Sequence, residues 1–73
     1  MGQFVPDRDF VNEIPTEKKL RQVLSDYNIN ITKFETKNSK AAGVRARLNL
    51  LELYQLCKTR RKEILERKKE LVY

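Results

Sequence analysis

The residues of this chain best able to do chemistry are its lysines and arginines, and the chemistry they offer is the binding of anions. One cluster lies at Lys40, Arg45 and Arg47, and a second occupies residues 58–69. Arginine matches phosphate oxygens with two parallel N–H donors, and the free N–H groups at a helix start also attract anions. The predicted nucleic-acid-binding residues are therefore Lys40, Arg45, Arg47, Lys58, Arg60, Arg61, Lys62, Arg67, Lys68 and Lys69.

The positive charge belongs to the second part of the chain. The 73 residues include 16 basic and 10 acidic ones, which gives a net charge of +6. Residues 1–30 carry four basic and five acidic groups, whereas residues 31–73 carry twelve basic and five acidic ones. Such an imbalance indicates an anionic partner: nucleic acid first, an acidic protein second, a membrane surface third. No aromatic residues are interleaved with the basic run and no helix-turn-helix pattern is present, so we expect recognition of backbone and shape.

The composition argues against catalysis and cofactors. The chain has no histidine and one cysteine, which excludes the usual zinc site and both Cys–His and Ser–His catalysis. No paired carboxylates converge, so we predict neither an enzyme nor a cofactor. Cys57 cannot form an internal disulfide and is expected to be a small buried residue. No apolar run approaches the length of a membrane span and the N-terminus does not resemble a signal peptide, so we expect an intracellular protein without membrane contact.

The stretch from residue 38 to residue 70 dominates the architecture. It contains no proline and consists mostly of good helix formers, which predicts a helix roughly 45 Å long. Its second half is mostly charged, whereas its first half is apolar on two sides. One side carries Ala46, Leu50, Leu53, Tyr54, Cys57, Ile64 and Leu71, and the opposite side carries Val44, Leu48 and Leu51.

A shorter helix is predicted from Glu17 to Lys37. The start signal is Pro15-Thr16, with Thr16 as the N-cap. A heptad-like seam follows at Leu20, Leu24, Tyr27, Ile31 and Phe34, with Val23 beside it. Asparagines and β-branched residues at 28–32 are poor helix formers, so the sequence is also compatible with a bend there or with a break into two helices.

Residues 36–39 predict a tight turn, which makes the two helices antiparallel neighbours. We expect the shorter helix to pack on the side of Leu50, Leu53, Tyr54 and Cys57, with the small residues 41–43 allowing close approach near the turn. The predicted fold class is all-α, an antiparallel coiled-coil-like hairpin with a long basic second helix. It divides into an extended or short-helical N-terminal arm, residues 1–15, and a hairpin domain, residues 16–73.

Such a hairpin leaves apolar surface uncovered. We expect Val44, Leu48 and Leu51 to form an interface, either in a homodimer or beneath the N-terminal arm as a third layer. The apolar residues of this arm are Phe4, Val5, Phe10, Val11 and Ile14.

Over roughly residues 20–70 the sequence resembles a known pattern, of which the stretch from Lys40 to Arg47 is the specific part. It has an aromatic residue next to lysine, then Asn-Ser-Lys-Ala-Ala, a small residue, and two arginines one apart. A leucine-rich stretch and Arg-Lys-Glu-Ile follow. These elements are Lys33-Phe34, residues 38–42, Gly43, Arg45, Arg47, Leu50, Leu53, Leu56 and residues 61–64. The pattern is similar to that of the bacterial linker-histone-like nucleoid proteins, the family first known from chlamydiae. The chain departs from it at Arg60, where the family usually has an apolar residue.

The resemblance implies a basic helical hairpin that binds duplex DNA without sequence specificity and organises the nucleoid. Many family members carry a long tail rich in lysine and alanine, and residues 1–73 contain none. Residues 1–15 have no counterpart in the pattern. We expect a cytoplasmic, nucleoid-associated protein, or a virus-encoded one acting in the host cytoplasm. The other function left open is a small helical interaction module or regulator that binds a larger protein through Val44, Leu48 and Leu51.

Overall fold

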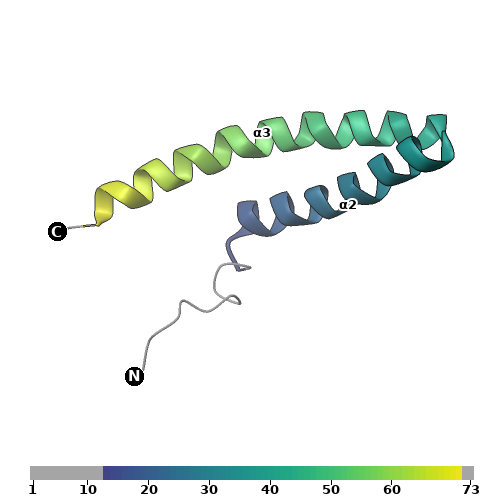
Figure 1. Cartoon of the computed structure of the whole chain (residues 1–73). Helices are drawn as coiled ribbons and strands as arrows, with labels where there is room; N and C mark the ends of the chain where they lie inside the picture. Colours follow the sequence, from purple (N-terminus) through teal and green to yellow (C-terminus); the bar gives the residue numbers. More distant parts are fainter. Residues whose placement is uncertain (1–12, 72–73) are drawn as a thin grey trace, which may run out of the picture.

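The protein is a hairpin of two helices joined by a two-residue turn (Figure 1). The computed structural model describes residues 13–71, with α2 at Pro15–Lys37 and α3 at Lys40–Glu70. The helices pack side by side in opposite directions, and α3 continues past the start of α2. No strand occurs in residues 13–71, which confirms the predicted all-α hairpin. The expected contact of the arm with Val44 and Leu48 involves residues 1–12, which lie outside the described range.

The turn is built from Asn38 and Ser39. Asn38 adopts the left-handed conformation with φ of 54°, which asparagine tolerates better than most residues, and it ends α2. The N–H of Ser39 donates to the Lys33 carbonyl at 3.5 Å, and the Ser39 hydroxyl accepts from the backbone N–H of Ala42 at 3.2 Å. The turn therefore satisfies backbone groups of both helix ends while it reverses the chain.

Helix α2 starts earlier than the sequence suggested. Ile14 is its N-cap and Pro15 its first residue, so the prediction that Thr16 caps the helix is wrong. Proline is suited to the first helical position because its fixed φ matches the helix and its missing N–H has no partner there anyway. The first backbone bond runs from the N–H of Lys18 to the Ile14 carbonyl at 2.9 Å. The Thr16 hydroxyl is thus available for α3 and donates to Glu63 at 2.6 Å.

Helix α2 is continuous through residues 28–32, where the sequence left a bend or a break into two helices undecided. The Asn30 amide spans the two helices: its Nδ2 donates to Asn49 Oδ1 at 2.9 Å, and its Oδ1 accepts from Arg45 Nε at 3.1 Å. A residue with poor helix propensity is tolerated here because both of its polar atoms have partners on α3. A polar pair of this kind in a helical seam specifies the register of the two helices.

The contact face follows heptads, but it is offset from the predicted one. On α3 the shielded residues alternate at spacings of four and three: Ala42, Ala46, Asn49, Leu53, Leu56, Arg60 and Glu63. On α2, Val23 is 2% exposed and Leu24 44%, so Val23 and not Leu24 belongs to the seam. Of the α3 residues predicted to face α2, Leu53 lies in the seam, and Leu50 lies at its edge, where it lines a hollow together with Ile31 and Phe34 of α2. The prediction is wrong for Tyr54 and Cys57, which are exposed, as is the expectation of a buried Cys57. The prediction assigned the most apolar side chains to the seam. The observed seam also includes polar residues, which form hydrogen bonds with the opposite helix.

The two helices approach closely near the turn, as the small residues there predicted. Ala42 and Ala46 are buried, and the Phe34 ring lies directly against Gly43. A Cβ atom at Gly43 would come within 2.7 Å of this ring, so glycine is what permits the contact. Within residues 13–71 the fully shielded core consists of Val23, Ala42 and Ala46, which is very small for a folded domain.

A matched pair of truncations tests the corrected seam. We expect Val23→Ala to lower the free energy of unfolding by about 1–2 kcal/mol, because it leaves a void in the tightest part of the interface. Leu24→Ala, which removes more atoms from an exposed position, should change it by less than about 0.5 kcal/mol. Urea denaturation followed by circular dichroism measures both values. A larger loss for Leu24→Ala would restore the seam predicted from the sequence.

Candidate nucleic-acid interface

The basic residues of α3 separate according to their position relative to the seam. Since the seam itself repeats every seven residues, side chains seven apart keep a constant position relative to α2. Five residues share such a position, and we call them the heptad row: Lys40, Arg47, Tyr54, Arg61 and Lys68. All five are exposed. From Lys40 to Lys68 the row extends about 42 Å along the helix at 1.5 Å per residue.

The side of α3 that carries the heptad row has no acidic residue. The acidic residues of α3 are Glu52 and Glu66, at heptad positions on the other side, and Glu63 and Glu70, in line with the seam. Lys58 lies next to the row, with its ammonium 5.0 Å from the centre of the Tyr54 ring. We call the five basic side chains of this side the outer cations: Lys40, Arg47, Lys58, Arg61 and Lys68. Among the described residues, none of the outer cations forms an ion pair.

The structure places the other predicted residues elsewhere. Arg67 pairs with Glu70 at 3.5 Å and Lys69 pairs with Glu66 at 3.9 Å, both as exposed neighbours three residues apart. Exposed pairs of this kind add little stability, but each neutralises its cation locally. Arg45 donates to Asn30 at the helix contact. Lys62 lies off the heptad row and lines two hollows, one with Arg61 and Lys68 and one with Glu63 and Glu66.

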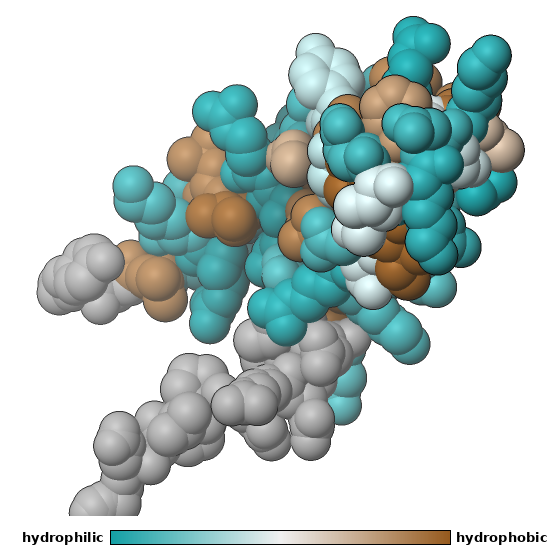
Figure 2. All heavy atoms as spheres, turned by 45° about the vertical axis from the view of Figure 1, so that its right-hand side comes forward, coloured by the Kyte–Doolittle hydropathy of each residue, from teal (hydrophilic) through white to brown (hydrophobic). Residues whose placement is uncertain are grey.

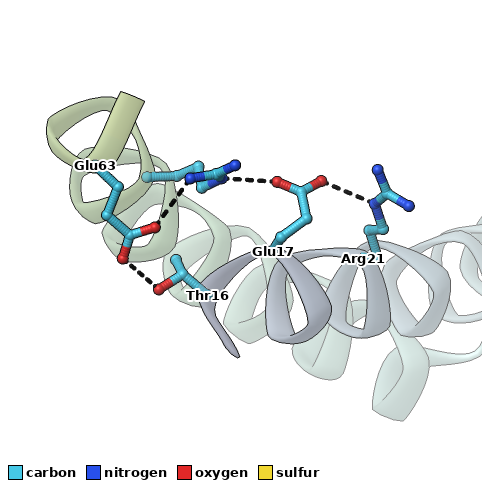
Figure 3. A network of polar contacts seen from close by, with 5 residues as sticks. Thr16, Glu17, Arg21 and Glu63 are labelled. Atoms are coloured by element: carbon cyan, nitrogen blue, oxygen red, sulfur yellow. Dashed lines mark hydrogen bonds and ion pairs between the residues drawn. The ribbon is translucent and has the colours of Figure 1, made fainter. Parts of the chain in front are cut away.

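Arg60 takes part in the contact between the two helices. Its Nε donates to Glu17 of α2 at 2.8 Å, and its Nη1 donates to Glu63 at 3.1 Å. Glu17 also accepts from Arg21 at 2.8 Å, and Glu63 accepts from Thr16, so one polar network joins the helices at the open end of the hairpin (Figure 3). The arginine that departs from the family pattern therefore replaces an apolar seam residue by an ionic one, and its guanidinium is engaged inside the molecule.

The network changes the proton affinity of its members. The hydrogen bond from Arg60, followed by that from Arg21, lowers the pKa of Glu17 below its usual value of 4.5. The same contact with Glu17 raises the pKa of Arg60. Glu17 is thus ionised in the folded hairpin at a pH where the same carboxyl group in the unfolded chain would begin to take up a proton.

Apolar side chains lie among the cations on the same side of the hairpin. A hollow near the turn is lined by Ile31, Phe34, Gly43, Val44, Ala46 and Leu50, together with Lys40 and Arg47. A second hollow toward the C-terminus is lined by Lys58, Arg61, Lys62, Ile64, Leu65 and Lys68. Figure 2 shows hydrophobic side chains exposed between hydrophilic ones on the face that it presents.

Two aromatic members of this surface were not predicted from the sequence. Phe34 belongs to α2, so its place beside Lys40 and Arg47 becomes visible only once the hairpin is folded. Tyr54 was assigned to the interior side of α3. Its spacing of seven residues from both Arg47 and Arg61 was the available signal for its place in the heptad row.

The fold and the surface define a small basic helical-hairpin protein, one side of which carries cations without acidic residues. Residues 13–71 contain no group of side chains that could hold a metal ion. Neither α2 nor α3, as far as the structure describes the chain, has the length and hydropathy needed to cross a membrane.

Comparison with known proteins agrees with this class. The family model described as histone H1-like protein Hc1 matches residues 15–70, and the chain belongs to this family. Its members are non-enzymatic, DNA-binding proteins of the histone-like kind, so the family implies a DNA partner and a place in the nucleoid. Searches of curated proteins and of solved structures gave no match to this chain.

The lowered pKa of Glu17 predicts a pH-dependent stability. A carboxyl group with a lowered pKa stabilises the fold above its unfolded value near 4.5, and this contribution is lost as the pH falls through the folded pKa. We expect Glu17→Gln to lower the melting temperature at pH 7, with the difference from the wild type shrinking between about pH 5 and 3. Thermal melts followed by circular dichroism measure this difference. The control is Glu35→Gln, which removes an exposed carboxylate, and a constant difference for Glu17→Gln across the range would contradict the network.

Proposed function

We propose that the chain binds duplex DNA without sequence specificity, through contacts between phosphates and the outer cations of α3. The observation that carries the proposal is the composition of this side: five basic side chains over about 42 Å, no acidic residue, and no ion pair among the described residues. Duplex DNA presents one negative charge per about 1.7 Å of its axis, so a helix lying along it meets phosphates throughout its length.

The rest of the interface favours contact with the backbone over base reading. The side chains near the outer cations are aliphatic, aromatic or small, and none of them is an asparagine or glutamine aligned with the heptad row. Bidentate contacts to base edges in the major groove require such groups, or an arginine held in a recognition helix. Arg45, Lys62, Arg67 and Lys69 add to the positive field, and Arg60 acts by holding the hairpin together.

The salt dependence of binding distinguishes the outer cations from the paired ones. We expect Arg47→Ala/Arg61→Ala to lower the slope of log K against log salt by about 1.8, since each phosphate contact contributes about 0.9. The matched control Arg67→Ala/Lys69→Ala removes the same charge from ion-paired positions and should change the slope by less. Both should leave the helical signal intact because alanine is a good helix former. Fluorescence titration of unrelated duplexes at several salt concentrations gives the slopes.

If the two double variants change the slope equally, only the net charge of the protein matters for binding. The heptad row would then have no special part in phosphate contact. Absence of duplex binding by the wild type at about 50 mM salt would contradict the proposed mode of binding altogether.

We further propose that the chain forms a homodimer through Val44, Leu48 and Leu51. These side chains are 58%, 60% and 58% exposed, and they lie on the side of α3 away from α2. Large aliphatic groups gathered in this way are typical of an interaction surface. The heptad row lies to one side of the patch, so we expect a dimer formed there to leave Lys40, Arg47, Arg61 and Lys68 of both copies accessible, whereas Lys58 lies in line with Val44 and Leu51. Two rows in one particle would bind DNA more tightly than either alone.

Charge placed in this patch should separate the copies. We expect Leu48→Asp and Leu51→Asp each to convert a dimer at micromolar concentration into a monomer, because an unpaired carboxylate is costly to bury. Ser25→Asp, on the exposed side of α2, is the control and should leave the dimer unchanged. Sedimentation equilibrium measures the mass. A wild-type chain that is already a stable, cooperatively folding monomer would refute the homodimer and favour another protein, or the arm, as the partner of the patch.

A further inference from the structure

We infer that the face carrying the heptad row also binds single-stranded DNA, with unpaired bases stacking on Phe34 and Tyr54. The inference rests on the proposed phosphate contacts of α3 and adds a second kind of contact, available only to bases that are not paired in a duplex. It assigns a role to the two aromatic side chains that phosphate binding alone does not use.

Phe34 provides the first stacking surface. Its ring lies against Gly43, where the missing side chain makes room for it, and it remains 40% exposed. The hollow that it lines has an apolar floor of Ile31, Ala46 and Leu50. The remaining lining includes Lys40 and Arg47, two of the outer cations. An apolar recess with two cations beside it suits a base together with its own phosphates.

Tyr54 provides the second stacking surface. It is 59% exposed and occupies the central position of the heptad row, between Arg47 and Arg61. Lys58 places its ammonium 5.0 Å from the centre of the ring, which brings a further cation to the same spot. Tyr54 lies eleven residues beyond Gly43, which the Phe34 ring contacts, and therefore about 16 Å further along the helix. One strand of several nucleotides can therefore reach both aromatic rings.

Single strands and duplexes differ in what they can offer to such a surface. In a duplex the bases are stacked on one another, so only the phosphates reach the cations. In a single strand the bases can turn outward and stack on aromatic rings, an interaction that tolerates any sequence and alternates with phosphate contacts in known single-strand binders. Cations interleaved with aromatic rings along one line are what such a strand requires, and α3 with Phe34 provides this arrangement.

The test compares one single strand with one duplex of equal phosphate number. Oligothymidylate of about 20 nucleotides and a mixed-sequence duplex are titrated by fluorescence anisotropy at the same salt concentration. We expect Tyr54→Leu to weaken single-strand binding about fivefold or more and to leave duplex binding unchanged. Phe34→Leu should act in the same direction, and Tyr54→Phe should bind like the wild type because it keeps the ring. Ile29→Ala, which truncates an exposed apolar residue of α2, is the control.

A second measurement does not depend on the folding of any variant. Ultraviolet crosslinking of wild-type protein to an oligonucleotide containing bromouracil should attach the base to Tyr54 or Phe34, as identified by mass spectrometry. Equal losses for single strand and duplex, no loss in either, or crosslinks confined to other residues would each overturn the inference. If duplex binding depends on Arg47 and Arg61, the proposed function stands in all three cases. If the wild type does not bind the duplex, both the proposed function and this inference are contradicted.

Discussion

The contact of Arg60 with Glu17 and Glu63 is the constraint on which the rest of the hairpin depends. Only Val23, Ala42 and Ala46 are fully shielded among residues 13–71, so burial of apolar surface cannot by itself hold two long helices together. The turn fixes one end through its own backbone bonds, but the open end lies more than twenty residues away along each helix. There the guanidinium joins a carboxylate of each helix while remaining partly hydrated, which keeps the cost of desolvation low.

The polar contacts also decide which side of α3 faces outward. Asn30 with Asn49 and Arg60 with Glu17 are satisfied in one register only, since a shift of one residue turns a helix by about 100°. Such a turn would bring Leu50 and Cys57 against α2, together with Arg47 and Arg61 of the heptad row. The hydrogen bonds across the seam thus favour the register in which the heptad row is exposed.

The sequence predicts what is local and fails where partners lie across the hairpin. The two helices and their turn follow from Pro15, the Asn38-Ser39 turn and the composition between them, and the family follows from residues 33–64. The Thr16 cap was wrong for a local reason, because Pro15 takes the first helical position and makes Ile14 the N-cap. The choice of Leu24 over Val23 and the buried Cys57 were wrong because both depended on the seam, which is set by side chains on the opposite helix that no local pattern reveals. Arg60 looked like a surface cation because its two carboxylate partners are 43 and 3 residues away in the chain.

The segregation of charge connects this architecture to DNA binding. Five carboxylates, those of Glu17, Glu52, Glu63, Glu66 and Glu70, have basic partners within the hairpin. Glu17, Glu52 and Glu63 lie in contacts that join the two helices or flank their seam, and none of the five lies on the side of the heptad row. The acidic residues thus stabilise the fold while the outer cations stay uncompensated. The folded hairpin thus gives one side of α3 a run of basic residues without acidic neighbours, which the net charge of +6 alone does not reveal.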